Sequence, residues 1–264
     1  MDGAADRALR AVVVFWWCVA AAGLWVFGLY IAAVYGVGVA SGDLVRWNVV
    51  LPDGHGYVRG DAPGNTTLGV HLAAAFLVTA SGLLQLVPRL RARAPAVHRW
   101  NGRLFLSAGM AAAVSGLLIA LTRGAVAGDY MTAGNALNAA LILLCGGMAW
   151  RRAVQRRIAE HRRWALRAFI VINAIWFYRL GMMFWFTVNR GPVGHTDAFD
   201  GPWDIFLAFA HVLVPLGVME LYLAARDRGG ALARGLMAGG LLVATLAMGV
   251  GIAAAVAFMW LPRI

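Results

Sequence analysis

The stretch APAVHRWNGRLFL, residues 94–106, is followed further along the chain by the similar stretch IAEHRRWALRAFI, residues 158–170. Both stretches place a histidine beside arginine and tryptophan, and both stand between an arginine-rich segment and an apolar run. The basic segments before them also match, because Arg89 precedes His98 by nine residues and Arg152 precedes His161 by nine. Similar residues at similar spacing indicate that one structural unit occurs twice.

The likeness continues beyond the two histidines. Trp100, Arg103 and Phe105 correspond to a second set with one residue inserted, which consists of Trp164, Arg167 and Phe169. Since an apolar run lies on each side of both basic segments, we expect two copies of a helical hairpin. The second and third helices of the chain form one copy, and the fourth and fifth helices form the other.

The composition is typical of an integral membrane protein. Of the 264 residues, 61% are hydrophobic and only 13% are charged, and the mean hydropathy is +0.72. Apolar runs near the length of about 20 residues that crosses a bilayer as a helix recur along the chain. We therefore predict an all-α, polytopic transmembrane bundle of about seven spans, forming a single integral membrane domain over residues 1–264. The predicted spans are about 11–38, 67–88, 101–121, 134–151, 164–187, 205–225 and 235–260.

The arginines predict the orientation of this bundle. All 23 basic residues are arginine, and most of them fall in the segments that would be cytoplasmic if the N-terminus is cytoplasmic. The cytoplasmic loops of membrane proteins carry more arginine and lysine than the loops on the other side. The sequence therefore predicts a multi-pass protein of the bacterial inner membrane, with the C-terminus outside. The same topology explains the net charge of +11, so we expect no nucleic-acid partner.

Three ionisable residues are expected at one depth inside the bilayer. His71 and His211 should lie roughly 6 to 9 Å below the outer interface at a helical rise of about 1.5 Å per residue, with Arg179 slightly deeper. Ionisable side chains at such depth usually serve a function. Two imidazoles can hold a haem iron, and a guanidinium can pair with a haem propionate. We predict a haem b ligated by His71 and His211, with Arg179 beside a propionate.

The remaining polar residues permit further interpretations. His98 and His161 would hold a second haem or, together with Glu160, another metal; the alternative is that they only anchor helix ends. Glu220 would relay a proton or hydrogen-bond a neighbouring helix. Two histidines of the outer loops, His55 and His195, are expected to be solvated.

These observations favour an inner-membrane electron-transfer protein, acting as a membrane oxidoreductase or electron carrier. It would bind one or two haem b groups and exchange electrons with quinone, with lipid and other membrane subunits as neighbours. The alternative is a cofactor-free transporter or accessory subunit, in which His71, Arg179 and His211 form a buried polar network or bind a small anion. Motifs of ATPases and hydrolases, such as the P-loop, G-x-S-x-G and H-E-x-x-H, are absent from the sequence.

With His71, HRWNGR and HRRW in view, residues 67–187 resemble a widespread, uncharacterised family of bacterial predicted membrane proteins. That resemblance implies a membrane topology and no particular activity. The chain is more loosely similar to the two-haem cytochrome b superfamily, in which histidines near both membrane faces hold haem. It departs from that pattern in the fourth helix, where Asn135 and Asn138 stand in place of an outer histidine.

Overall fold

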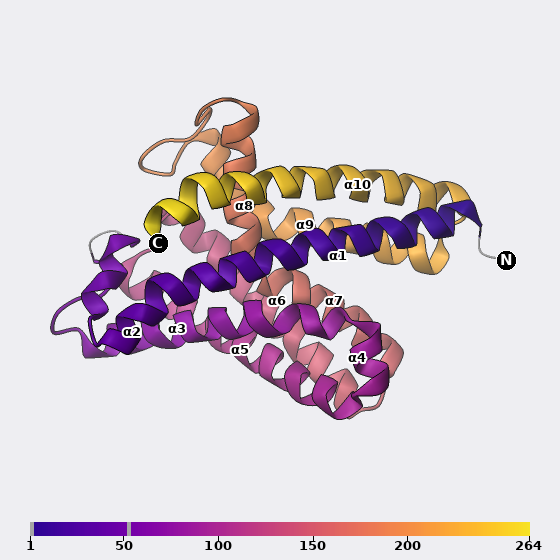
Figure 1. Ribbon diagram of the computed structural model, residues 1–264, viewed down its shortest axis with the longest axis horizontal. Coiled ribbons are helices and arrows are strands. Elements are labelled where there is room, and N and C mark those ends of the chain that lie inside the picture. The colour runs from indigo at the N-terminus through magenta and orange to yellow at the C-terminus, as the bar shows by residue number, and fades with distance from the viewer. Residues whose placement is uncertain (1–2, 52–53) are drawn as a thin grey trace.

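All of the regular structure in the computed structural model is helical over residues 3–51 and 54–264, which are the residues it describes (Figure 1). The first part of the chain forms α1 (Ala4–Ile31), η1 (Ala32–Gly36), α2 (Val37–Ser41), η2 (Leu44–Val49), α3 (Ala62–Ser81), η3 (Gly82–Leu86) and α4 (Pro88–Arg93). The second part forms α5 (Pro95–Arg123), α6 (Gly128–Val154), α7 (Ile158–Ile172), α8 (Ala174–Val188), α9 (Pro202–Arg228), α10 (Ala231–Ala254), η4 (Ala255–Trp260) and η5 (Leu261–Arg263).

Six helical segments are long and apolar enough to cross a membrane, and the pair α7 and α8 makes a seventh if it is counted as one span. Each predicted range falls on one of these segments, so the predicted all-α, multi-span class is confirmed. Most helices extend beyond the predicted apolar limits, because a helix continues to form backbone hydrogen bonds after its sequence becomes polar. The assignment of residues 1–264 to a single domain stays a prediction.

The bundle has two chemically different ends. The N-terminus, α4, the turn between α6 and α7 and the turn between α9 and α10 lie at one end, which we call the arginine-rich end (Figure 1). Residues 42–51 and 54–61, the loop of residues 189–201 and the C-terminus lie at the opposite end. The helices α1 and α10 run side by side between them. The chain therefore begins and finishes at different ends, as an odd number of spans requires.

The predicted span 164–187 is not one continuous helix, and this part of the prediction was wrong. The structure divides it at Asn173 into α7 and α8, which meet at an angle of 52°. The side-chain amide of Asn173 donates a hydrogen bond to the Phe169 carbonyl oxygen at 2.8 Å. Short polar side chains can compete with helical hydrogen bonds in this way. The break tilts α8 away from the rest of the bundle (Figure 1).

The two similar stretches occupy matching positions in the fold. His98 is the fourth residue of α5 and His161 is the fourth residue of α7, and each backbone amide bonds the carbonyl of the residue before its helix. In both copies the guanidinium group of the matched arginine lies over the ring of the matched tryptophan. The guanidinium carbon is 4.7 Å from the ring centroid for Arg103 and Trp100, and 4.9 Å from it in the second copy. The structure therefore reproduces the repeat as two geometrically similar helix entrances.

The matched phenylalanines bring the two copies into contact. Phe105 of α5 and Phe169 of α7 stack with ring centroids 6.1 Å apart. Gly82 packs against this pair, and a Cβ atom at Gly82 would lie 2.8 Å from the Phe105 ring. Such a distance is too short for an ordinary contact, so the close approach of η3 to the aromatic pair requires glycine.

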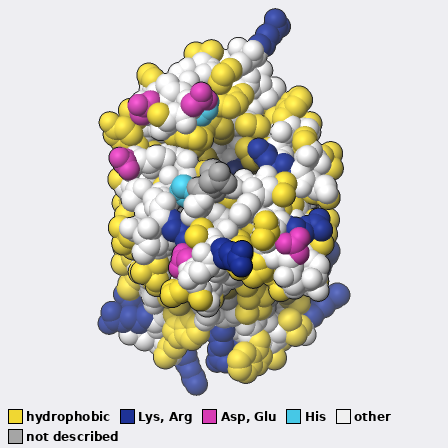
Figure 2. Space-filling model, turned by 90° about the vertical axis from the view of Figure 1, so that its left-hand side faces the viewer, with side chains coloured by type: hydrophobic (Ala, Val, Ile, Leu, Met, Phe, Trp, Pro, Cys, Tyr) yellow, Lys and Arg dark blue, Asp and Glu magenta, His cyan; other side chains and the backbone are white. Residues whose placement is uncertain are grey.

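The loops at the opposite end are fastened by ion pairs. Arg123, at the end of α5, bonds the Asp61 carboxylate, the Asn65 side chain and the Gly56 carbonyl. In the second loop, His195 lies 2.7 Å from the buried carboxylate of Asp204. The expectation that His195 is solvated was therefore wrong, because Asp204 and two neighbouring aromatic rings enclose it. His55 is also only partly exposed. Figure 2 looks onto this end, which is hollowed near its centre.

Candidate functional site

The arginine-rich end brings His98 and His161 together. The two imidazoles lie within electrostatic range of each other. Nδ1 of His161 is 2.9 Å from the Ala149 carbonyl oxygen, so this nitrogen carries the proton and donates it. Nδ1 of His98 is buried and has no hydrogen-bond partner in the described part of the chain. No hydrogen bond is made to Nε2 of either ring within the same residues. Both Nε2 atoms are thus available to a ligand.

At the opposite end, three predicted residues occupy corresponding positions along their helices. His71 lies nine residues after the start of α3, His211 nine residues after the start of α9, and Arg179 nine residues before the end of α8. Each is therefore about 13 to 14 Å along its helix from that end. This distance is measured from the helix end and not from the membrane interface, so the predicted depth of 6 to 9 Å stays a prediction.

His71 faces the neighbouring hairpin helix α5. Its Nδ1 lies 3.0 Å from the Ala112 carbonyl oxygen and 3.3 Å from the Ser115 hydroxyl oxygen, and the carbonyl requires Nδ1 to be the donor. A Cβ atom at Gly116 would be 2.9 Å from the imidazole ring. The glycine therefore makes room for the ring, and the hydrogen bond leaves Nε2 free.

His211 has a more enclosed environment. Its Nδ1 lies 3.1 Å from the Leu207 carbonyl oxygen of its own helix, and its ring meets the Tyr178 ring edge-on at 5.9 Å. The residue is only 2% exposed, and its Nε2 is buried with no hydrogen-bond partner. Among the described residues no hydrogen bond joins His211 to His71. The structure therefore places the two histidines in separate surroundings, His71 against α5 and His211 against α8.

Arg179 lies over the Phe27 ring of α1. One of its guanidinium nitrogens donates to the Ile175 carbonyl oxygen at 3.2 Å, and the group lies 5.1 Å from the centre of the Phe27 ring. His71, Tyr30 and Tyr35 are within electrostatic range of it. No carboxylate pairs with Arg179 over residues 3–51 and 54–264. Sequence reasoning missed the two tyrosines, whose only signal was a pair of hydroxyl groups in an otherwise apolar first span.

Glu220 is held in an ion pair with the repeat. Its two carboxylate oxygens accept from Nε and Nη2 of Arg167 at 2.6 and 2.7 Å, which joins α9 to α7. Of the two predicted roles for Glu220, the structure shows the bond to a neighbouring helix. Arg167 was recognised only as a matched residue of the repeat, because its partner lies 53 residues away in sequence.

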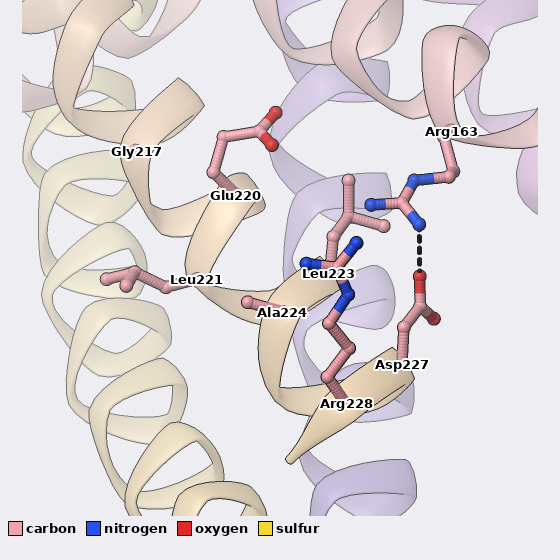
Figure 3. A pocket seen from close by; sticks show the side chains of 8 residues that line it. All are labelled: Arg163, Gly217, Glu220, Leu221, Leu223, Ala224, Asp227 and Arg228. Atoms are coloured by element: carbon pink, nitrogen blue, oxygen red, sulfur yellow. Dashed lines mark hydrogen bonds and ion pairs between the residues drawn. The ribbon is translucent and has the colours of Figure 1, made fainter. Parts of the chain in front are cut away.

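A groove beside this ion pair opens between α7 and α9 at the arginine-rich end (Figure 3). It has a volume of about 540 Å³. Arg163 of α7 bonds Asp227 of α9 across it at 2.8 Å. Arg228 extends into the groove beside the apolar side chain of Leu223. Acidic and basic groups are paired on its walls, so the groove has little excess charge to select a ligand.

Glu160 does not complete a metal site with the two inner histidines. It pairs instead with Arg152 at 3.0 Å and with Arg157. Within the described ranges, no group of three or more His, Cys, Asp or Glu side chains could hold a metal ion. The imidazoles of His98 and His161, which lie within electrostatic range of each other, remain as two potential ligands.

The helices and the duplicated hairpin define a multi-span helical membrane protein. The family model described as "Predicted membrane protein (DUF2306)" matches residues 68–222, which is more than half of the chain, and the chain belongs to this family. The match confirms the family resemblance and extends it into α9. No curated protein and no solved structure matches the chain. The looser similarity to two-haem cytochromes b accordingly rests on the residues alone.

Proposed function

We propose that this protein carries electrons in the membrane and binds haem b between His98 and His161. One observation supports this assignment. Two imidazoles from matching positions of the duplicated hairpin lie within electrostatic range of each other, and neither Nε2 has a protein hydrogen bond within the described residues. Bis-histidine ligation needs two neutral imidazoles on opposite faces of the porphyrin. When bound, haem supplies reversible one-electron transfer.

The protein contributes orientation and charge to such a site. The Ala149 carbonyl oxygen holds the proton of His161 on Nδ1, which leaves the lone pair on Nε2 for a ligand. Arg91 and Arg99 lie within electrostatic range of His98, where guanidinium groups can pair with the propionates. These residues make the arginine-rich end suitable for haem, which has an apolar ring and two negatively charged propionates.

The predicted pair of His71 and His211 suits haem less well. Nδ1 of His71 is hydrogen-bonded to the Ala112 carbonyl of α5, whereas Nε2 of His211 is buried beside the Tyr178 ring of α8. A macrocycle at that nitrogen would have to displace packed side chains. A second haem at this pair and exchange of electrons with quinone both stay predictions.

We further propose that the arginine-rich end faces the cytoplasm of a bacterial cell, with the chain in the inner membrane. The support for this orientation is the arginine content of α4, of the region where α6 turns into α7 and of the region where α9 turns into α10. In that orientation His98 and His161 lie at the inner surface.

The test is a comparison of four histidine variants, purified from cells grown with ample haem. We expect wild-type protein to show a reduced-minus-oxidised haem spectrum. The pyridine-haemochrome content should fall at least tenfold in His98→Ala and in His161→Ala, because one imidazole cannot replace two. His71→Ala and His211→Ala should retain the wild-type content, and His195→Ala is the control for loss of an unrelated histidine.

The opposite pattern would place the cofactor at the other end: loss in His71→Ala and His211→Ala with no loss in the inner variants. A colourless wild-type protein that is monodisperse and melts cooperatively contradicts haem binding altogether. In that case the predicted cofactor-free alternative, a transporter or accessory subunit, becomes the better account.

A further inference from the structure

Arg179 carries a positive charge inside a helix that crosses the membrane, and no acidic side chain in the described ranges neutralises it. Its contacts are the Ile175 carbonyl oxygen and the face of the Phe27 ring. A cation at such depth is costly unless it is paired. Arg123, near the same end of the bundle, has its carboxylate partner in Asp61. The missing partner of Arg179 is an anion that the protein does not supply.

Neutral hydrogen-bonding groups lie near this cation, because the Phe27 ring beneath the Arg179 guanidinium is itself stacked on the Tyr30 ring, with ring centroids 6.2 Å apart. Tyr30 of α1, Tyr35 of η1 and His71 of α3 are all within electrostatic range of Arg179, and Tyr30 is within range of Tyr35. Neither tyrosine hydroxyl nor Nε2 of His71 has a hydrogen-bond partner among the residues that the structure describes. None of these three atoms is fully enclosed, since none is among the buried atoms that lack a partner. Each of these atoms therefore keeps some accessible surface that a ligand could contact.

The helices that pack beside Arg179 are irregular. The first span contains the π-helical segment η1, which includes Tyr35, and the last span contains the π-helical segment η4, whose Trp260 stacks on Tyr30. The third irregularity is the break at Asn173, which tilts the helix that carries Arg179. Short π-helical segments occur frequently at functional sites. Three neighbouring spans therefore depart from regular geometry around one group of polar side chains.

We propose that Arg179, Tyr30, Tyr35 and His71 form a binding site for a single carboxylate group. The guanidinium fork matches the two oxygens of a carboxylate, and the hydroxyl groups can donate to the same oxygens. The charge also matches, because one carboxylate neutralises one guanidinium. A dianionic phosphate would leave a net negative charge inside the membrane. This site is separate from the histidine pair at the arginine-rich end and does not depend on haem binding there.

Two sources could supply the carboxylate: a small acid that enters through the hollowed opposite end (Figure 2), or a fatty acid that enters from the lipid. Equilibrium dialysis of detergent-purified protein against radiolabelled propionate and, separately, radiolabelled oleate distinguishes them. We expect saturable binding of one of these probes. Binding of propionate assigns the site to small soluble acids, and binding of oleate alone assigns it to fatty acids.

Variants connect the binding to the proposed residues. Arg179→Gln should weaken binding at least tenfold, because it removes the only charge at the site. Tyr35→Phe should weaken binding roughly three- to tenfold, the loss expected for one neutral hydrogen bond. Arg190→Gln, which alters an exposed arginine at the same end, should bind like wild type.

The melting temperature without ligand separates binding from folding. We expect Arg179→Gln to melt at or above the wild-type temperature, since it removes an uncompensated charge. If Arg179→Gln melts lower, its loss of binding could come from misfolding. The binding affinity of the double variant Tyr30→Phe/Tyr35→Phe then tests the site, because this variant keeps the positive charge and the aromatic packing. Binding of neither probe, or wild-type affinity in that double variant, overturns the proposal. The haem content of each variant should equal that of wild type, so this proposal and the haem proposal can fail independently.

Discussion

Two arginines near the same end of the bundle differ in what surrounds them. Arg123 bonds a carboxylate, an amide and a carbonyl, and it fastens the loop of residues 54–61 to the end of α5. Arg179 has a carbonyl and an aromatic ring but no carboxylate among the described residues. A fully bonded arginine is explained by structure, whereas an arginine without an acidic partner is the better candidate for binding a ligand.

The Arg123 pair should make stability depend on pH. The hydrogen bond from Arg123 lowers the pKa of Asp61 below its ordinary value of 3.8, and the backbone amide of Gly64 lowers it further. Because the folded-state pKa is lowered, the stabilisation is complete above the unfolded pKa and is lost as pH falls through the folded pKa. Asp61→Asn should therefore melt below wild type at pH 7, and the difference should shrink at pH 3.

Asp43→Asn is the matched control for that measurement, since Asp43 is an exposed carboxylate in the same loop region. It should leave the melting temperature unchanged at pH 7. An Asp61→Asn variant whose deficit persists unchanged at pH 3 would show that the effect comes from the altered side chain and not from its ionisation.

At the scale of elements, the duplicated hairpin depends on close contact between its two copies. The stacked Phe105 and Phe169 rings lie against Gly82, so α5, α7 and η3 pack against one another at this glycine. Two glycines of the bundle make it possible to separate this packing effect from the ordinary preference of helices for alanine.

Gly82→Ala should destabilise the protein by about 1–3 kcal/mol, because its Cβ atom would overpack the aromatic pair. Gly147→Ala in α6 should be neutral or stabilising by up to about 1 kcal/mol, since nothing lies within 4 Å of its Cβ position and alanine favours helix. Reversible denaturation of both variants in the same detergent measures the difference. Equal effects would contradict the packing assigned to Gly82.

At the scale of the whole molecule, the unequal distribution of arginine predicts which end faces the cytoplasm. Ala159 is exposed at the arginine-rich end and Asp197 is exposed at the opposite end. In a variant without Cys18 and Cys145, a membrane-impermeant thiol reagent should label Asp197→Cys in intact cells. Ala159→Cys should be labelled only after permeabilisation. Labelling in the reverse order would invert the proposed orientation.

The sequence by itself determined the membrane class, the six to seven apolar spans and the repeat. These depend on the length, composition and order of residues in each segment, which are local properties of the chain. It also identified His98 and His161 as equivalent, because a repeat can be recognised by spacing alone. The break at Asn173 was missed, since an asparagine in an apolar run does not reveal whether its amide bonds its own helix or a neighbouring one.

Only the tertiary structure decided which side chains meet. His71 and His211 are equally far along their helices, yet His71 faces α5 and His211 packs against Tyr178. Arg179 lies beside two tyrosines of the first span, and Glu220 pairs with Arg167 across 53 residues. The physical reason is that sequence gives the depth of a side chain, whereas the rotation of each helix about its axis depends on how all the helices pack.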